Sequence, residues 1–216
     1  MLRRLRPNVR RTLTVRTVGP RAARLDRLDV PPGRHGPSAV LVTGLAGGCE
    51  PGLAPGDVIL GDPVSVVGDG REEGADPELR DRAVRALDAA RLRYRVGRLL
   101  TVDEVVTSPA EKAKWWRSDS VVAVDMESAH VLAWARRAGL PGLAVRVVAD
   151  GPGDDVPSDL LGVVGADGRM RARTVAQLLG RPALLPSAWR LGRRSHRALE
   201  SLGRFMRAFV DTPGAP

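Results

Sequence analysis

Two short apolar segments, each ending on or beside a carboxylate, constrain this chain more than any other feature. Residues 121–125 read Val-Val-Ala-Val-Asp, and residues 143–150 read Leu-Ala-Val-Arg-Val-Val-Ala-Asp. Such runs are typical of buried strands, and the segment between them has the composition of a helix. Strand, helix and strand in this order predict a parallel βαβ unit, whose strand ends reach the sheet edge where open α/β folds bind ligands. We therefore expect Glu127 and Asp150 to lie near each other.

The rest of the chain predicts one α/β domain around this unit. Pro77, next to an N-capping Asp76, begins a helix that ends near Leu92, and Ser108 with Glu111 forms a capping box at the start of another. The fold class is a three-layer α/β/α sandwich with a mixed central sheet and a C-terminal helical extension. Further strands are expected at 12–18, 38–44, 57–60, 63–67 and 94–102, a polar loop at 69–75, and C-terminal helices at 171–179 and 186–210.

We expect three regions along the chain. Residues 1–11 form a basic N-terminal segment, residues 12–180 form the α/β domain, and residues 181–216 form the C-terminal extension. The chain of 216 residues is long enough for one sizeable core. Since aromatic residues make up only 3% of the chain, that core is built from Val, Leu and Ala.

Composition excludes several classes of protein. The net charge of +9 comes from 32 arginines against two lysines, a skew that we attribute to coding bias, and no nucleic-acid-binding motif accompanies it. No segment is long and apolar enough to span a membrane. The single cysteine, Cys49, permits no internal disulfide, and beside the Gly47-Gly48 turn we interpret it as a small packing residue rather than a nucleophile.

Three motifs in a fixed order resemble one enzyme family. They are Val-Asp-Met-Glu-Ser at 124–128, Arg146 followed by Asp150, and Gly-Leu-Ala-Gly-Gly at 44–48 with Leu-Ala-Pro-Gly-Asp-Val at 53–58. Together they resemble the purine nucleoside phosphorylase and nucleosidase superfamily, which includes the methylthioadenosine/adenosylhomocysteine nucleosidases. The resemblance implies cleavage of the N-glycosidic bond of a purine nucleoside, with no cofactor and no metal.

The resemblance also implies roles for individual residues. Asp150 is the catalytic acid that protonates the purine as it leaves, and Glu127 accepts hydrogen bonds from the ribose hydroxyls with Met126 against the sugar. Arg146 either orients Asp150 or pairs with another carboxylate, and the sequence leaves both alternatives open. Further substrate-binding positions are Ala46, Gly47, Val105 and Val106.

Departures from the family pattern bear on the nucleophile. Related phosphorylases hold phosphate with an arginine and a serine in an Arg-x-Gly-Ser segment, and Val42, Gly44 and Leu45 occupy that stretch here. This favours water over phosphate, with Arg21 or Arg24 as the substitute anion ligands if the protein is a phosphorylase. At residues 103–106 a valine replaces the aromatic residue that stacks on the purine in the family.

The start of the family pattern is also missing. Related nucleosidases activate water with a glutamate that follows their first strand, and no matching segment precedes residue 12 in this sequence. We therefore keep, beside the active enzyme, the alternative of an N-terminally truncated and inactive member that binds a ligand.

Within the superfamily the chain is most similar to the hopanoid-associated phosphorylase-like proteins, which remove adenine from adenosylhopane. The resemblance rests on Ser-Pro-Ala-Glu-Lys-Ala at 108–113 and on the tail at 178–186. It implies a small-molecule nucleoside with a hydrophobic 5′ substituent, a homodimer, and a cytoplasmic protein. Helix 186–210 carries an apolar stripe beside six arginines, and the stripe serves either for packing within the fold or for weak contact with anionic lipid.

Overall fold

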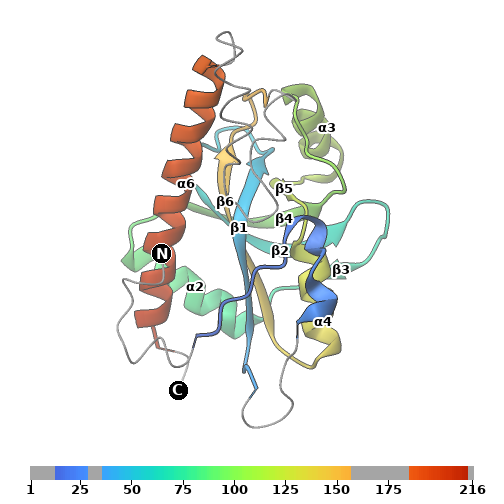
Figure 1. Cartoon of the computed structure of the whole chain (residues 1–216), viewed down its shortest axis with the longest axis vertical. Helices are drawn as coiled ribbons and strands as arrows, with labels where there is room; N and C mark the ends of the chain where they lie inside the picture. Colours follow the sequence, from blue (N-terminus) through green and yellow to red (C-terminus); the bar gives the residue numbers. More distant parts are fainter. Residues whose placement is uncertain (1–12, 29–35, 157–184, 214–216) are drawn as a thin grey trace.

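The computed structural model describes residues 13–28, 36–156 and 185–213. These residues form a mixed α/β fold with one central sheet and helices on its two sides (Figure 1). The elements are, in chain order, η2 (Pro20–Ala22), η3 (Leu25–Arg27), β1 (Val40–Gly48), β2 (Val58–Val66), β3 (Glu72–Glu73), α2 (Pro77–Ala89), β4 (Tyr94–Thr101), α3 (Pro109–Asp119), β5 (Ala123–Asp125), α4 (Ser128–Arg137), β6 (Gly142–Asp150) and α6 (Leu185–Asp211).

The sheet is mixed and closes on itself. Its strand order is β3-β2-β4-β5-β1-β6, and β2 also pairs with β6, antiparallel, from Val58 opposite Val147 to Gly61 opposite Ala144. Strands β2, β4 and β5 run parallel to one another, and β1 runs parallel to β6. Because helices lie on both sides, β6 is buried along almost its whole length, as its continuous apolar run predicts.

The predicted parallel βαβ unit is wrong in its pairing. Strands β5 and β6 are not neighbours, since β1 lies between them, antiparallel to β5 and parallel to β6. The order of the strands in the sequence suggested a direct pair between β5 and β6. Instead, β1 pairs with β6 at eight positions, and only Gly47 and Gly48, the last two residues of β1, pair with the three-residue β5. The ends of β5 and β6 still meet, because both reach the end of β1.

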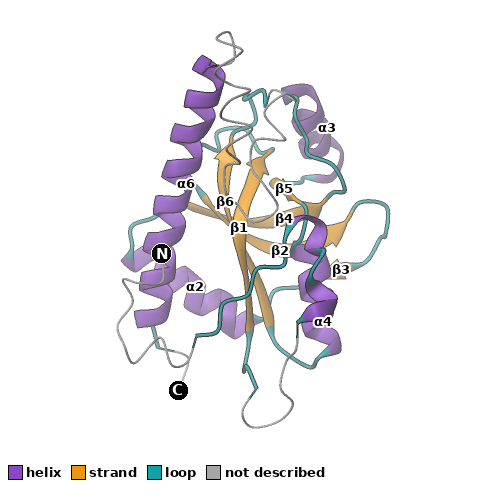
Figure 2. Cartoon of the chain, viewed as in Figure 1, coloured by secondary structure: helices purple, strands orange, loops and turns teal. Residues whose placement is uncertain are grey.

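Helices cover the sheet on both sides, which confirms the predicted layered α/β class (Figure 2). On one side, Ala83, Ala86 and Leu87 of α2 share a core cluster with buried residues of α6, β2 and β6. On the other side, Leu132 of α4 and Leu25 of η3 pack with residues of β1, β2 and β4. Aliphatic side chains dominate both clusters, as the low aromatic content predicts.

The two predicted helix starts are present. The carboxylate of Asp76 accepts a hydrogen bond from Leu79 N at 2.9 Å, and the hydroxyl of Ser108 accepts one from Glu111 N at 3.2 Å. In each case proline occupies the first turn, where its missing N–H costs no hydrogen bond. Local capping therefore fixes where α2 and α3 begin.

Other local predictions need correction. Residues 13–18 form no strand, because no described strand pairs with them, and Val15 is 49% exposed. The strands predicted at 57–60 and 63–67 are one strand, β2, whose register shifts between Gly61 and Val64. The loop predicted at 69–75 contains the short β3, paired with β2. The predicted helix at 171–179 lies outside the described residues.

Helix α6 is attached to the fold by its apolar stripe and its C-terminal end. Leu202, Phe205 and Phe209 are buried in the cluster with α2, whereas Leu199 is 52% exposed. Arg82 of α2 donates hydrogen bonds to the carbonyls of Phe209 and Thr212 and lies 4.4 Å from the centre of the Phe209 ring. The packing alternative therefore accounts for these side chains. Within the described ranges, no helix is both long enough and apolar enough to cross a membrane.

The packing of α6 predicts a difference between two truncations on the same helix. Phe205→Ala, which removes a fully buried ring, should lower the free energy of unfolding by about 3–5 kcal/mol in urea denaturation followed by circular dichroism. Leu199→Ala, on the exposed face, should change it by less than about 1 kcal/mol. Equal effects of the two variants would contradict this arrangement of α6.

Candidate active site

A cavity of about 210 Å³ opens where the ends of β1, β5 and β6 meet. Seven residues predicted from the sequence to bind substrate or to act on it line this cavity: Ala46, Gly47, Val105, Val106, Met126, Glu127 and Asp150. Apolar side chains make up most of the remaining wall, and among the described residues the carboxylates in it are those of Asp125, Glu127 and Asp150. The cavity thus has the composition of a small-molecule site, with a few polar groups in an apolar lining.

Gly47 is the residue at which the three strands converge. It pairs with Val124 of β5 on one side and with Asp150 of β6 on the other. A Cβ atom at this position would lie 3.2 Å from Asp150 Oδ2 and 3.3 Å from Val124 Cγ2, which is tighter than ordinary packing. The absence of a side chain at Gly47 therefore permits the Asp150 carboxylate to lie against the end of β1.

Asp125, in the wall of the cavity, links its own strand β5 to β4, β6 and α4. Its carboxylate lies 2.6 Å from Arg146 Nη2 and accepts hydrogen bonds from Thr101 Oγ1 at 2.7 Å and from Ser128 N at 3.1 Å. The last bond satisfies a free N–H at the start of α4, and Thr101 Oγ1 accepts another from Ala129 N. Because Asp125 is only 5% exposed, these partners replace the contacts with water that its carboxylate loses on burial.

Arg146 pairs with carboxylates of β5 and its following turn. Besides Asp125, it lies 3.2 Å from Glu127 Oε2, and its Nε donates to Ser128 Oγ at 2.9 Å. Its guanidinium passes directly over Gly44, where a Cβ atom would collide with Nη1. Of the two alternatives left open by the sequence, the structure has Arg146 next to Asp125 and Glu127 rather than next to Asp150.

Glu127 is held from two sides at the edge of the cavity. Arg146 contacts Oε2, and the backbone N–H of Arg21 donates to Oε1 at 3.3 Å. Burial raises the pKa of Glu127 above its ordinary value, and the nearby Arg146 acts in the opposite direction. Arg146 therefore favours the carboxylate form, which accepts hydrogen bonds.

The two arginines predicted as alternative anion ligands lie differently. Arg21, at the left-handed backbone angle φ of 54°, brings its N–H to Glu127 and donates from Nε to the carbonyl of Asp103 at 2.6 Å. Arg24 is exposed and does not line the cavity. Only Arg21 is therefore near the site.

Asp150 is paired with Lys112 of α3. The ammonium group of Lys112 lies 2.5 Å from Asp150 Oδ2, and the lysine side chain is completely buried. Burial raises the pKa of Asp150 above its ordinary value, while the charge of Lys112 and its hydrogen bond lower it. Asp150 is thus a carboxyl group whose protonation state is set by two opposing effects.

Cys49 follows β1 but has the properties of a packing residue. Its side chain is 1% exposed, and burial raises the pKa of its thiol to about 12. The reactive thiolate is therefore scarce near neutral pH, which agrees with the interpretation from the sequence.

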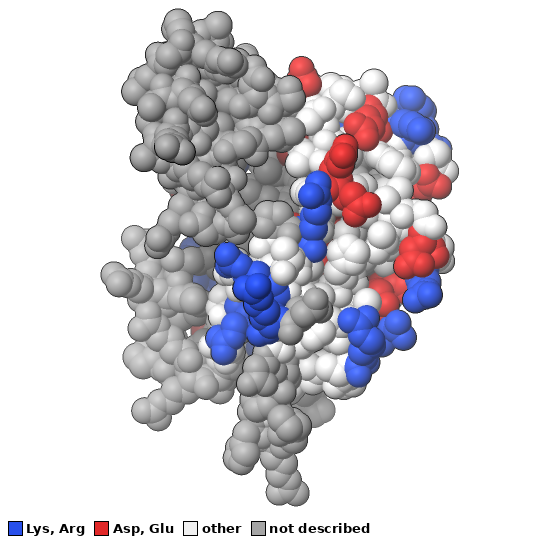
Figure 3. All heavy atoms as spheres, turned by 45° about the vertical axis from the view of Figure 1, so that its right-hand side comes forward, with Lys and Arg blue, Asp and Glu red and all other residues white. Residues whose placement is uncertain are grey.

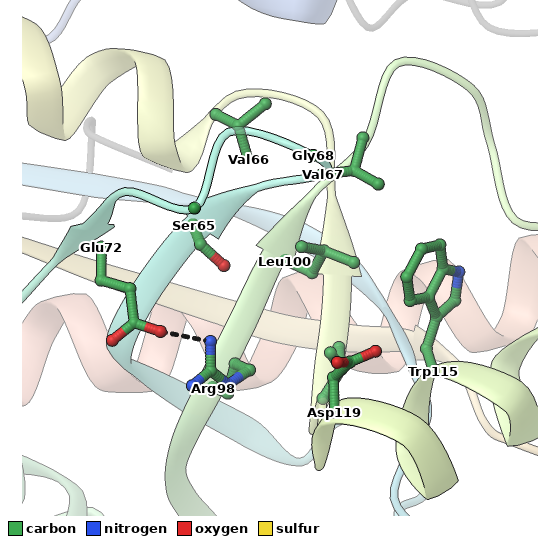
Figure 4. Close-up of a pocket in the computed structure, with 11 residues that line it drawn as sticks. Ser65, Val66, Val67, Gly68, Glu72, Arg98, Leu100, Trp115 and Asp119 are labelled. Atoms are coloured by element: carbon green, nitrogen blue, oxygen red, sulfur yellow. Dashed lines mark hydrogen bonds and ion pairs between the residues drawn. The ribbon is translucent and has the colours of Figure 1, made fainter.

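A second cavity, of about 170 Å³, lies apart from the predicted site residues (Figure 4). It is bordered by Ser65 and the turn after β2, by Arg98 and Leu100 of β4, and by Trp115 of α3. Figure 4 shows Arg98 and Glu72 pointing toward each other, and their charged groups lie 2.5 Å apart. No residue of the three sequence motifs lines this cavity.

The excess of arginine does not produce a uniformly basic face in the view of Figure 3, where acidic and basic side chains are intermixed. Elsewhere in the fold, arginine is paired with carboxylates, as Arg71 is with Asp69, Arg80 with Asp62 and Arg136 with Glu73. The described residues visible in Figure 3 therefore form no continuous positive surface of the kind that a nucleic-acid backbone binds.

Sequence reasoning missed several residues that support the site. Asp125, Thr101 and Ser128 were not singled out, although Asp125 and Ser128 lie within the Val-Asp-Met-Glu-Ser motif. Lys112 was also missed, and a signal for it was present. It is one of only two lysines in a chain that otherwise uses arginine, and it lies on a helix that capping predicted.

Comparisons with known proteins identify the family. A family model described as the Phosphorylase superfamily matches residues 32–181, more than half of the chain. The chain therefore belongs to the Phosphorylase superfamily. No curated protein matches the sequence.

Solved structures share the fold. They include a 5′-methylthioadenosine/S-adenosyl homocysteine nucleosidase from Campylobacter jejuni (24% identity, TM-score 0.52, covering 56% of this chain and 59% of that one). Futalosine hydrolase from Helicobacter pylori matches at 15% identity and TM-score 0.55 over 81% of this chain and 68% of that one. An S-adenosylhomocysteine nucleosidase from Streptococcus pyogenes matches at 21% identity and TM-score 0.53, over 79% and 68%. At these identities the likeness concerns the fold.

The Asp125–Arg146 pair predicts a strong effect on stability. Asp125→Asn removes one charge from a buried pair and should lower the free energy of unfolding by about 3 kcal/mol. The matched control is Asp69→Asn, since Asp69 pairs with Arg71 at the surface, where an ion pair contributes about 0–1 kcal/mol. Urea denaturation of both variants tests this, and equal stability would show that the buried pair is not required.

Proposed function

We propose that this protein cleaves the N-glycosidic bond between adenine and ribose in a 5′-substituted adenine nucleoside, with water as the nucleophile. The observation that carries this proposal is that Asp150 and Glu127 line one cavity from the ends of different strands. Membership of the Phosphorylase superfamily supports it. The similar solved structure from Campylobacter jejuni is a 5′-methylthioadenosine/S-adenosyl homocysteine nucleosidase, and that from Streptococcus pyogenes is an S-adenosylhomocysteine nucleosidase.

In the proposed reaction Asp150 is the general acid. As the bond between C1′ of the ribose and N9 of the base breaks, electrons move into the purine ring, and a proton at N7 makes the base a better leaving group. A carboxylic acid is suited to this step when its pKa lies nearer to the working pH than that of a solvated aspartate. The burial of Asp150 acts in that direction.

Glu127 is proposed to bind the ribose. A carboxylate accepts hydrogen bonds from two neighbouring hydroxyls, and Arg146 favours the carboxylate form of Glu127. Met126, Ala46 and Gly47 border the sugar and the base in this proposal. Val105 and Val106 contact the purine through dispersion alone, because neither offers an aromatic face.

The choice of water over phosphate is supported by how the nearby cations are used. Arg146 is already shared between Asp125 and Glu127, and Lys112 is paired with Asp150. The positions on β1 that correspond to the phosphate-binding arginine and serine of related phosphorylases hold Val42, buried in the core, and Leu45, an apolar residue that lines the cavity. Arg21, at the edge of the site, donates through Nε to a backbone carbonyl, and a phosphorylase alternative would depend on this residue.

We further propose adenosylhopane as the substrate, on the resemblance of residues 108–113 and 178–186 to hopanoid-associated proteins. The mostly apolar lining of the cavity suits a hydrophobic 5′ substituent. We propose a cytoplasmic homodimer that meets the bilayer only weakly. Contact by residues 186–210 would use Leu199, Arg197 and Arg207, which are exposed, because the rest of the described apolar stripe is buried.

Incubation with 5′-methylthioadenosine or adenosylhopane should release adenine, measured by chromatography. Asp150→Asn should lower kcat/KM by about a hundredfold or more because the amide cannot donate the proton. Asp155→Asn is the matched control, since Asp155 is exposed in the loop after β6 and should retain the wild-type rate. If Asp150→Asn kept the wild-type rate, Asp150 would not be the general acid.

A version of the protein that begins further upstream in the same reading frame is assayed in parallel. Absence of adenine from both versions would favour the alternative of an inactive member that binds a ligand. Ligand binding by the wild-type protein, measured by calorimetry with 5′-methylthioadenosine, then tests that alternative directly.

Phosphate dependence distinguishes the two nucleophiles. We expect the rate of adenine release to be the same with and without phosphate, and the sugar product to be free of phosphate, because no pair of cations is available to bind the anion in the described part of the site. Strict dependence on phosphate and a ribose-1-phosphate product would reverse the conclusion. In that case Arg21→Gln should weaken the apparent affinity for phosphate.

A further inference from the structure

Lys112 has a fully buried side chain, and its charge lies beside the proposed catalytic acid. The ammonium group has three N–H donors and three acceptors. It donates to Asp150 Oδ2 at 2.5 Å, to the carbonyl of Gly151 at 3.0 Å and to the carbonyl of Asp154 at 2.9 Å. A buried ammonium is costly unless it is paired and fully hydrogen-bonded, and here both conditions are met.

The same contacts fix the turn that follows β6. The Asp154 carboxylate accepts a hydrogen bond from Gly151 N at 2.8 Å and lies 2.7 Å from Arg194 of α6. The turn from Gly151 to Asp154 is therefore held by α3 through Lys112 and by α6 through Arg194. Of these two cations, only Lys112 touches Asp150 in the described structure.

The contact with Lys112 makes the two oxygens of Asp150 unequal. Lys112 occupies Oδ2, and a Cβ atom added at Gly47 would also approach Oδ2 more closely than Oδ1. No described residue donates a hydrogen bond to Oδ1, although Asp150 lines the cavity. An ammonium on one oxygen thus leaves the other oxygen for a ligand.

We propose that Lys112 is a positioning residue that holds Asp150 by Oδ2, presents Oδ1 to the purine N7, and stabilises the carboxylate formed when the proton leaves. This inference rests on the proposed function. In the step, the O–H bond of Asp150 breaks and the N7–H bond forms, while the electron pair of the C1′–N9 bond moves into the purine. Water adds to C1′ and releases a proton that restores the acid, so that nucleoside and water give adenine and the free sugar.

Lysine suits this position better than the arginine used elsewhere in the chain. Its charge is compact, and its three donors match three acceptors grouped around one point, whereas a guanidinium is planar and larger. The two carbonyl contacts tie Lys112 to the turn, and the counter-charge that its buried ammonium needs comes from Asp150 itself. The direct contact with Oδ2 is the feature that a positioning role explains.

The test compares variants on the two sides of the turn. Lys112→Met keeps the apolar stem and removes the ammonium, and Arg194→Gln loosens the turn from α6 without touching Asp150. Lys114→Met is the matched control, since Lys114 is the only other lysine and is exposed on the same helix. Thermal unfolding of each variant first establishes that it is folded.

For the wild-type protein and folded variants, the rate of adenine release from 5′-methylthioadenosine is measured against pH. We expect Lys112→Met to lower kcat about tenfold or more, with KM changed by less than about threefold. Activity falls as pH rises through the pKa of Asp150, because the acid must carry its proton. Without the ammonium that pKa is higher, so the alkaline limb should move up by about one pH unit or more. Lys114→Met should keep the wild-type limb, and Arg194→Gln, which removes a charge that acts on Asp150 without touching it, should move the limb less than Lys112→Met does.

A second readout does not depend on activity. With aspartate labelled at the carboxyl carbon, Asp150 is followed by NMR through a pH titration, and Asp150→Asn assigns its signal. Four groups interact electrostatically with Asp150: Lys112 from α3, Asp154 from the turn, Arg194 from α6 and the Cys49 thiol. The variant Lys112→Met removes the first of these groups and retains the other three. We expect the titration to move to higher pH in this variant.

An unchanged titration and an unchanged pH limb in Lys112→Met would overturn the inference, and so would equal changes in Arg194→Gln, which would assign the effect to the turn. If the wild-type protein released no adenine, the proposed function would fail. The titration would then still decide whether Lys112 controls Asp150.

Discussion

The buried ion pair between Asp125 and Arg146 is the contact on which the arrangement of the site depends. It joins the end of β5 to the middle of β6, two strands that are not neighbours in the sheet. The same two side chains bind Thr101 of β4 and Ser128 at the start of α4, so that three strands and one helix share a single network. An ion pair of this kind contributes less to net stability than to geometry, because its desolvation cost offsets most of its attraction.

That network explains how Glu127 is positioned without being part of a regular element. Glu127 lies between β5 and α4 and makes no side-chain capping hydrogen bond to its own helix, so its direction is set by Arg146 and by Arg21 N. Asp150 is fixed independently, by the end of β1 and by Lys112. The two carboxylates of the proposed reaction therefore have separate supports, and a change that displaces one leaves the other in place.

How far the sequence predicts this structure depends on the range of each interaction. Caps at Asp76 and Ser108 are local, and the helices they begin were predicted within a few residues. Strand pairing is not local: β1 lies between β5 and β6 because of contacts far apart in sequence, and the described part of the strand expected at 12–18, residues 13–18, pairs with no described strand. The lining of the cavity could be predicted because resemblance located the motifs. The rarity of lysine in this chain marks Lys112 as unusual, but nothing in its helix indicates that it faces Asp150.

The distribution of charge around the cavity limits the chemistry that these residues support. Two buried cations, Arg146 and Lys112, are each paired with carboxylates of the site, so the described walls carry little positive charge available to an incoming anion. An anionic nucleophile needs such charge to be desolvated, whereas neutral water does not. The cations instead act on the carboxylates: burial raises the pKa of both Glu127 and Asp150, while Arg146 lowers that of Glu127 and Lys112 lowers that of Asp150. Because the two groups are alike in this respect, the proposed division of labour, in which Glu127 accepts hydrogen bonds and Asp150 donates a proton, rests on their different places around the cavity.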